Sequence, residues 1–227
     1  MFAASSQVPG STSSIPRSKA FGRAVRPAEI QRALALGQFI AVFQPFVHPR
    51  TGAVALLEAT VRWRHPLRGI LAPCDFLCEA DQYGLLDDIA LELSRQAALA
   101  ASPIPIAVSL SGAVLRSMST QMVISESVAS LRALRRIDLS HCNDTRAALT
   151  AHLIAREGAA GIALTGVGTL LKWYVASEYG VELVQGDFIC PPMPRHAVGE
   201  ALQRWRLTFD AINASSETRA LPLPNQH

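Results

Sequence analysis

The sequence predicts an α/β fold, and three observations support this. Two β-rich runs, 39–45 and 53–57, are joined by a Thr51-Gly52 turn and are typical of adjacent strands. Helical patterns and further short apolar runs follow one another from residue 75 to residue 212. The chain has 227 residues, of which 49% are hydrophobic, so it can bury a sizeable core as one domain.

The first half of the chain predicts three helices and three strands. Pro27 suits a first helical turn, Glu29 favours its positive end, and Gly37 stops the helix at about residue 36. After the strand pair, helices are expected at 75–83, closed by Gly84, and at 87–101. The candidates for burial in the second of these helices are Ile89, Leu91, Leu93 and Ala97. An apolar strand is then expected at 106–111.

The second half predicts shorter strands and a closing helix. The expected elements are strands at 136–140, 162–169 and 181–184, and helices from Asp144 or Thr145 through Glu157, at 170–178 and at 197–212. In the closing helix, Leu202, Trp205 and Phe209 are expected to face inward.

Charge and composition define the ends of the predicted domain. Residues 1–26 carry four basic side chains and no acid among Ser, Ala, Gly and Pro, which is typical of a disordered basic tail. The domain is expected to span 27–212, and 213–227 to form a flexible C-terminal tail. The sequence contains no run of about 20 apolar residues, so no membrane span is predicted. The net charge of +3 is mild, so direct contact with nucleic acid is not expected.

The cysteines and histidines do not predict a metal site. Cys74 and Cys78 are four residues apart, without the second close pair that a zinc site needs, while Cys142 and Cys190 stand alone. Reduced thiols in a cytoplasmic protein are the expectation. The histidines are scattered singly, so a histidine metal site is not predicted.

Glu58 and Arg62 lie four residues apart in the second strand, so both side chains leave the same face. Taken alone, the two side chains favour a structural ion pair over a functional site.

Several motifs occur in a fixed order along the chain. They are Phe-Gln-Pro at 43–45, Thr-Gly at 51–52, Glu-Ala-Thr-Val-Arg-Trp-Arg-His-Pro at 58–66, Gly-Ile-Leu-Ala-Pro at 69–73, and Val-Gln-Gly-Asp-Phe at 184–188 before Pro-Pro-Met-Pro at 191–194. In this order they resemble the EAL domain, the bacterial phosphodiesterase module that cleaves cyclic di-GMP. The resemblance covers roughly 27–206, strongly at both ends and poorly in the middle.

The resemblance implies a TIM-barrel-like fold, here a truncated or open barrel. The family has two further strand-helix units between its Asn-Leu-Ser and Lys-Ile-Asp strands, which match residues 109–111 and 136–138 here. Only residues 112–135 lie between these two matches. We therefore expect a deletion of roughly two βα units, leaving about 185 core residues against the ~250 of a complete barrel.

The resemblance also implies which residues bind metal and nucleotide. Family members hold two divalent ions with carboxylates and an asparagine, and only Glu58 of that set is clearly kept. The degenerate positions are Thr60 for a leucine, Ser109 for the asparagine, Arg136 for a lysine, and Thr165 for a glutamate. Arg62 corresponds to a phosphate contact, and Gln44 and Gln185 to residues near the guanine bases.

We therefore expect no catalytic residue, no bound metal and no phosphodiesterase activity, with Mg²⁺ or Mn²⁺ bound only if the metal site survives. The leading hypothesis is an inactive EAL-like regulator that acts by contact with a regulatory protein in cyclic di-GMP-linked signalling, with a homodimer as one option. The alternative is a cyclic di-GMP receptor that binds through Gln44, Glu58, Arg62 and Gln185 without hydrolysis. An active phosphodiesterase is the third possibility.

Overall fold

The structure is a computed structural model that describes residues 25–100, 102–109, 134–140, 142 and 161–219. Along the chain the elements are α1 (Pro27–Ala35), β1 (Phe39–Val47), β2 (Val54–His65), β3 (Gly69–Leu71), η1 (Pro73–Asp75), α2 (Leu77–Gln82), α3 (Leu86–Leu99), β4 (Ile106–Ser109), β5 (Leu134–Asp138), β6 (Gly161–Thr165), α6 (Leu170–Glu178), β7 (Leu183–Val184), η3 (Arg195–Ala197) and α7 (Val198–Arg219). Strands and helices are mixed along the chain, which confirms the predicted α/β class.

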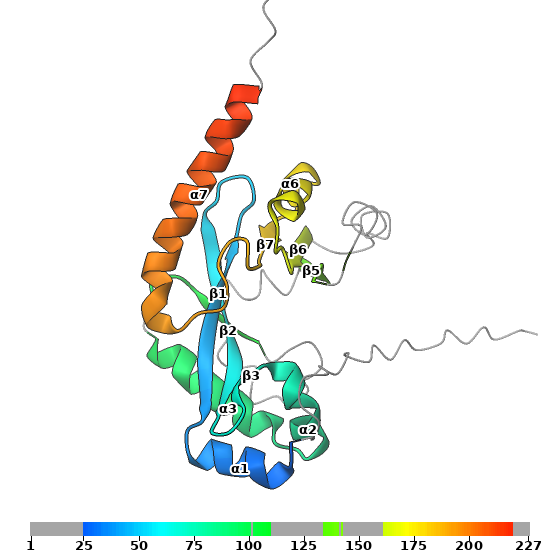
Figure 1. Ribbon diagram of the computed structural model, residues 1–227, viewed down its shortest axis with the longest axis vertical. Helices are drawn as coiled ribbons and strands as arrows, with labels where there is room; N and C mark the ends of the chain where they lie inside the picture. The colour runs from blue at the N-terminus through cyan, green and yellow to red at the C-terminus, as the bar shows by residue number, and fades with distance from the viewer. Residues whose placement is uncertain (1–24, 101, 110–133, 141, 143–160, 220–227) are drawn as a thin grey trace, which may run out of the picture.

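The strands form one curled sheet in the order β3-β2-β1-β7-β6-β5, with β4 parallel to β2. β1 runs antiparallel to both β2 and β7, whereas β5, β6 and β7 are parallel. Within the described residues, β4 pairs only with β2 and β5 only with β6. The sheet is thus a curled half-barrel (Figure 1), as the prediction of a truncated or open barrel required.

The long β1–β2 ladder connects the two ends of the molecule. Helices α1, α2 and α3 gather at one end, while α6 and the strands β5, β6 and β7 lie at the other (Figure 1). β1 is longer than the predicted run and continues through Pro45 to Val47. A proline is tolerated there because the missing N–H costs nothing where no partner strand needs it. In this ladder Gln44 lies opposite Glu58.

The outer edge of β1 is covered by other parts of the chain. The Gln96 side chain, from α3, accepts from the N–H of Ala41 at 2.7 Å and donates to the carbonyl of Phe39 at 2.8 Å. Farther along, Phe43 exchanges two backbone hydrogen bonds with Met193. These contacts satisfy backbone groups that an unpaired strand edge would expose.

The helices follow the predicted pattern with one error in the buried face. Gly37 and Gly84 both have positive φ, +61° and +69°, and end α1 and α2 as expected. In α3 the buried stripe includes Ile89, Leu93 and Ala97, but Leu91 is 72% exposed. The prediction for Leu91 was wrong because two residues of helix turn the chain by about 200°, which places it opposite Ile89.

The predicted strand boundaries differ from the observed ones by a few residues. β5 starts at Leu134, two residues before the predicted strand, and ends at Asp138. β6 ends at Thr165 because Gly166 takes a positive φ of 73°. The predicted strand 106–111 is observed to Ser109, and its last two residues lie outside the described part.

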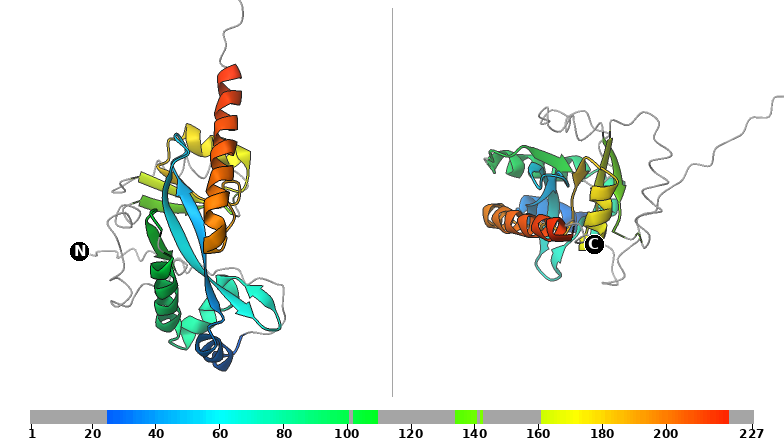
Figure 2. Two further views of the ribbon diagram at one scale, coloured as in Figure 1. Left: turned by 90° about the vertical axis from the view of Figure 1, so that its left-hand side faces the viewer. Right: turned by 90° about the horizontal axis from the view of Figure 1, so that it is seen from above.

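α7 ends seven residues beyond the predicted closing helix. It continues past Ile212 to Arg219, and Figure 2 shows it running beyond the sheet. The stretch 213–219 contains neither Gly nor Pro, so nothing local breaks the helix. Trp205 and Phe209 are buried as expected, and Leu202 packs against the core while partly exposed.

Two aromatic clusters lie toward opposite ends of the core. Trp63 contacts Phe39 and Phe76, with ring centroids 5.3 and 5.7 Å apart. Trp173 contacts Trp205 at 4.9 Å and Phe209 at 6.1 Å, which fastens α7 to α6. Edge-on and tilted ring contacts of this kind add to the free energy gained from burying the rings.

Some predictions concern residues outside the described part of the chain. They are the basic tail up to residue 24, most of the segment 112–135, the helix from Asp144 or Thr145 through Glu157, and the last residues of the C-terminal tail. In the part that is described, no helix is both long and apolar enough to cross a membrane.

Candidate functional site

Glu58 lies at the centre of a buried polar network. Its side chain is 5% exposed, and its two carboxylate oxygens have different partners. Arg136 Nη1, from β5, donates to Oε1 at 2.8 Å, and Gln185 Nε2, just after β7, donates to Oε2 at 2.9 Å. The ion pair between Glu58 and Arg62, which their spacing taken alone favoured, does not form, because Glu58 pairs with Arg136. The curled sheet brings Arg136 against the carboxylate from a strand 78 residues away, which no local spacing could indicate.

Arg62 lies on β2 and is half-buried. Its Nη1 donates to Thr60 Oγ1 at 3.3 Å and to the carbonyl of Val61 at 2.9 Å, both neutral acceptors. Burial lowers the pKa of Arg62 from its ordinary value, while Cys74 and Asp187 oppose this shift. Among the described residues, no carboxylate lies within ion-pair distance of its guanidinium.

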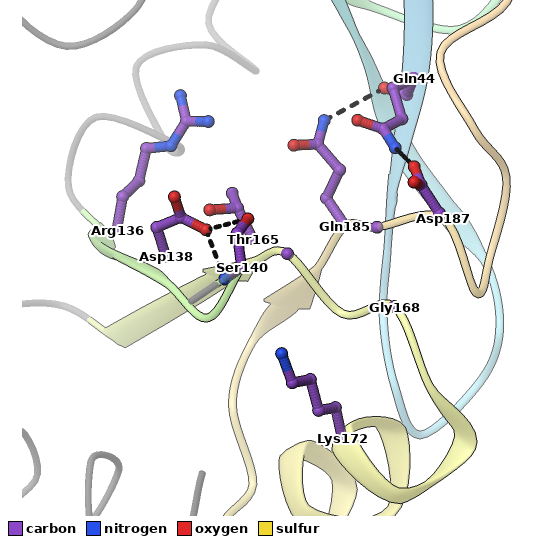
Figure 3. A pocket seen from close by; sticks show the side chains of 11 residues that line it. Gln44, Arg136, Asp138, Ser140, Thr165, Gly168, Lys172, Gln185 and Asp187 are labelled. Carbon is purple, nitrogen blue, oxygen red and sulfur yellow. Dashed lines mark hydrogen bonds between the residues drawn. The ribbon is translucent and has the colours of Figure 1, made fainter. Parts of the chain in front are cut away.

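The two predicted glutamines are connected to each other. Gln185 Nε2 also reaches the carbonyl of Gln44 at 3.4 Å, and Gln44 Nε2 donates to the carbonyl of Cys190 at 3.0 Å and to Asp187 Oδ1 at 3.3 Å. Figure 3 shows Gln44, Gln185 and Asp187 grouped at one side of a cavity. Gln44 and Gln185 are thus positioned by backbone groups and by one another.

Two adjoining cavities contain all eight residues that the sequence singled out. The first, of about 460 Å³, is lined by Gln44, Glu58, Thr60, Arg62, Pro73, Ser109, Arg136, Asp138, Thr165 and Pro192. The second, of about 420 Å³, shares Gln44, Arg136, Asp138 and Thr165 and adds Gln185, Asp187, Ser140, Lys172 and glycines (Figure 3). Residues from β1, β2, β4, β5 and β6 therefore meet at these two cavities.

Three charged residues of these cavities were missed by the sequence analysis. Asp138 Oδ1 accepts from the backbone N–H of Ser140 at 2.9 Å and from its hydroxyl at 2.7 Å. Lys172, in the first turn of α6, donates to the carbonyl of Leu139. Asp138 and Asp187 sit inside motifs that were recognised and could have been found there, whereas Lys172 had no sequence signal.

The comparisons with known proteins identify the family. The sequence model of the EAL domain matches residues 28–140. The chain belongs to the EAL domain family. This match includes Gln44, Glu58 and Arg62 and ends two residues after Asp138.

Relatives of this EAL chain are much larger proteins. An uncharacterized signaling protein of Caulobacter vibrioides is 31% identical over 102 residues, which is 43% of this chain and 13% of that protein. The cyclic di-GMP phosphodiesterase NbdA of Pseudomonas aeruginosa is 39% identical over 61 residues, which is 27% of this chain and 8% of that protein. The chain thus matches only a small fraction of the length of these relatives.

A solved structure supports the same fold. The EAL domain of FimX from Pseudomonas aeruginosa, solved bound to cyclic di-GMP, aligns with 73% of this chain and 95% of that one. The TM-score is 0.54 at 16% identity. The likeness therefore concerns the barrel-like architecture, which this EAL chain keeps as a half-barrel.

The described residues do not fit the two divalent cations that the EAL resemblance implies. Both oxygens of Glu58 already accept hydrogen bonds, one of them from a guanidinium. No group of three or more His, Cys, Asp or Glu suited to a metal ion occurs within the described ranges. Ser109, at the matching asparagine position, offers a hydroxyl in place of an amide oxygen. A cation at Glu58 would compete with the positive charge of Arg136, which is already paired with this carboxylate.

The four cysteines form no disulfide bond in the structure, and one of them has a packing role. Cys190 is buried, and burial raises the pKa of its thiol to about 11, so it is protonated at neutral pH. Its Sγ contacts the carbonyl of Ala201 at 3.6 Å. Cys190 therefore packs the loop that follows β7 against helix α7.

Proposed function

We propose that this EAL chain is a regulatory protein without phosphodiesterase activity, working in cyclic di-GMP-linked signalling through contact with a protein partner. The observation that carries this proposal is the state of Glu58. Each oxygen of its carboxylate accepts a hydrogen bond, one from the charged guanidinium of Arg136 and one from Gln185, whereas two-metal hydrolysis needs such carboxylates to bind cations.

A protonated arginine is a poor replacement for the lysine at this position. The guanidinium stays charged at every physiological pH, so Arg136 cannot accept a proton from an attacking water. At the other altered positions, Thr165 and Ser109 bring neutral hydroxyls to the same cavity. The described residues thus offer charge pairing at this site in place of a nucleophile or base.

The surface supports a role in protein contact. On α6, Leu170, Leu171 and Tyr174 are exposed and share one side of the helix, at spacings of three and four residues. In the described part, β4 and β5 each also have one strand edge that no other strand covers. Apolar helix faces and open edges of this kind suit a regulatory protein or a second copy of the chain.

The test is an assay for cyclic di-GMP hydrolysis by the purified chain with Mg²⁺ and with Mn²⁺. We expect no linear product above the rate without protein. A known active EAL phosphodiesterase, run in parallel, shows that the assay detects turnover. Sustained metal-dependent turnover by this chain would rule out the proposal.

A second candidate function is binding of cyclic di-GMP without hydrolysis. The cavity of about 460 Å³ favours it, because Gln44, Glu58 and Arg62 converge there with polar walls from Thr60 and Ser109. Replacing Arg62 with Ala separates the two candidates. The substitution should abolish nucleotide binding and leave association with a protein partner intact.

A further inference from the structure

Arg62 is a half-buried cation, and among the described residues no carboxylate lies within ion-pair distance of its guanidinium, although Asp187 acts on it from farther away. Its guanidinium donates to one hydroxyl and one carbonyl, and its side chain lines the cavity of about 460 Å³. Burying a charge without a counter-charge is unfavourable. An anion entering the cavity would supply the missing charge.

Arg136 faces the same cavity and has donors to spare. A guanidinium has five N–H groups, and the bond to Glu58 uses only Nη1. The side chain remains 42% exposed, and its charged end lies over the ring of Phe46, 5.4 Å from the centroid. This stacking and the Glu58 bond fix the guanidinium in place while its other N–H groups remain available.

The two acids that line this cavity are already engaged. Glu58 accepts from Arg136 and Gln185, and Asp138 Oδ1 accepts two hydrogen bonds from Ser140. Pairing with Arg136 neutralises Glu58, which would otherwise repel a phosphate. The remaining cationic group without a carboxylate partner at this cavity, within the described residues, is Arg62.

We propose that Arg136 takes the place of the divalent cations in this cavity, so that a phosphodiester binds between Arg62 and Arg136 without metal. The proposal rests on the second candidate function, nucleotide binding without hydrolysis. The planar guanidinium of an arginine can donate two parallel, charge-assisted hydrogen bonds to two oxygens of a phosphate group. The same guanidinium therefore blocks metal binding at Glu58 and supplies positive charge to the ligand.

The experiment is calorimetric titration of the whole chain with cyclic di-GMP, once in EDTA and once in Mg²⁺. We expect saturable binding with the same dissociation constant in both buffers. Arg136→Gln should weaken it about tenfold or more, since charge-assisted hydrogen bonds are lost. Arg136→Lys should bind with intermediate strength, because it keeps the charge and loses the planar fork.

Two further variants control for the loss of a surface charge and for unfolding. Arg204→Gln removes the same charge from an exposed pair on α7 and should bind like the unchanged chain. The double variant Glu58→Gln with Arg136→Gln leaves no orphan carboxylate, so its fold is protected, and it should show the same loss as Arg136→Gln. Thermal unfolding of each variant verifies that it is folded.

The outcomes separate this inference from the proposed function. Binding that needs Mg²⁺, or binding that is unchanged in Arg136→Gln, would overturn the role of Arg136. No binding in either buffer would also overturn it, but would leave the non-hydrolytic, protein-contacting regulator standing. Magnesium-dependent binding together with turnover would overturn both.

Discussion

Glu58 is a buried carboxylate whose charge is compensated from within the chain. The carboxylate is buried, so its charge needs compensation, and Arg136 and Gln185 provide it. Because Arg136 is only partly buried, the ion pair is partly screened by water. The pair therefore contributes chiefly by preventing an unpaired buried charge and less by its own attraction.

Removing either partner of this pair should have unequal effects on stability. Arg136→Gln leaves the Glu58 charge with Gln185 alone and should lower the free energy of unfolding by about 1–3 kcal/mol. Glu58→Gln leaves a guanidinium that reaches water and should cost less. Urea denaturation measures both. The exposed Arg204–Glu200 pair is the control, and Arg204→Gln should cost under about 0.5 kcal/mol. Equal costs for Arg136→Gln and Arg204→Gln would contradict this account.

His65 should make stability depend on pH. Burial lowers the pKa of its ring below the ordinary 6.5, with Arg68 adding to the shift and Glu29 opposing it. The neutral ring also accepts from the N–H of Leu67 through Nδ1 at 3.1 Å, which protonation would prevent. Below pH 6.5 the unfolded chain binds this proton and the folded chain resists it. The free energy of unfolding is therefore fully retained above pH 6.5 and falls as pH drops toward the lowered pKa.

The measurement is the free energy of unfolding at about pH 7.5 and about pH 5.5, on either side of the ordinary histidine pKa. His65→Gln should show a smaller difference between the two pH values than the unchanged chain. His196 is exposed, and His196→Gln should keep the full difference. If both variants behave alike, His65 is not the source of the pH dependence.

At the scale of elements, α7 is fastened to the β1–β2 turn. Trp205 Nε1 donates to the carbonyl of Gly52 at 2.9 Å, and a Cβ on Gly52 would lie 2.5 Å from Cγ of the Phe209 ring. Gly52 also has a positive φ of 66°. The turn glycine thus serves both the hairpin and the docking of a helix that is distant in sequence.

Gly52→Ala should destabilise the chain more than Gly37→Ala. Both glycines have positive φ, +66° and +61°, so both substitutions carry the left-handed strain of about 1–2 kcal/mol. A Cβ at Gly37 would meet nothing within 4 Å, whereas a Cβ at Gly52 would meet the Phe209 ring. The difference between the two melting temperatures isolates the clash with α7. Equal melting temperatures would mean that α7 moves aside without cost.

Local patterns predicted the elements better than the contacts between them. Gly37, Gly84 and the 3.6-residue spacing determined α1, α2 and most of α3, because these signals act within a few residues. The cavity was predictable since its lining residues Gln44, Glu58, Arg62 and Gln185 belong to ordered motifs. The Glu58–Arg136 bond was not, because it depends on how far the sheet curls. Leu91 was misplaced because apolar character alone does not determine which face of a helix is buried.

At the scale of the whole molecule, the half-barrel brings several of its strands to the same two cavities. β1, β2, β5 and β6 all deliver side chains to the two cavities, although β4 and β5 are not paired with each other within the described residues. The charge of Glu58, which a metal ion could compensate, is compensated instead by Arg136 from another strand of the same sheet. The Glu58–Arg136 ion pair therefore links β2 and β5, two strands that are not neighbours in the sheet.

This internal pairing predicts that divalent cations will not stabilise the protein. A ligand that binds the folded chain raises the free energy of unfolding by mass action, so a metal held at Glu58 would raise the melting temperature. Arg136 and Gln185 each donate to one oxygen of Glu58. We therefore expect millimolar Mg²⁺ or Mn²⁺ to shift the melting temperature by less than about 1 °C relative to EDTA. Glu58→Gln is the control for cations bound elsewhere on the surface. A metal-induced rise that disappears in Glu58→Gln would show that the carboxylate binds metal after all, whereas a rise kept in that variant would place the cation elsewhere.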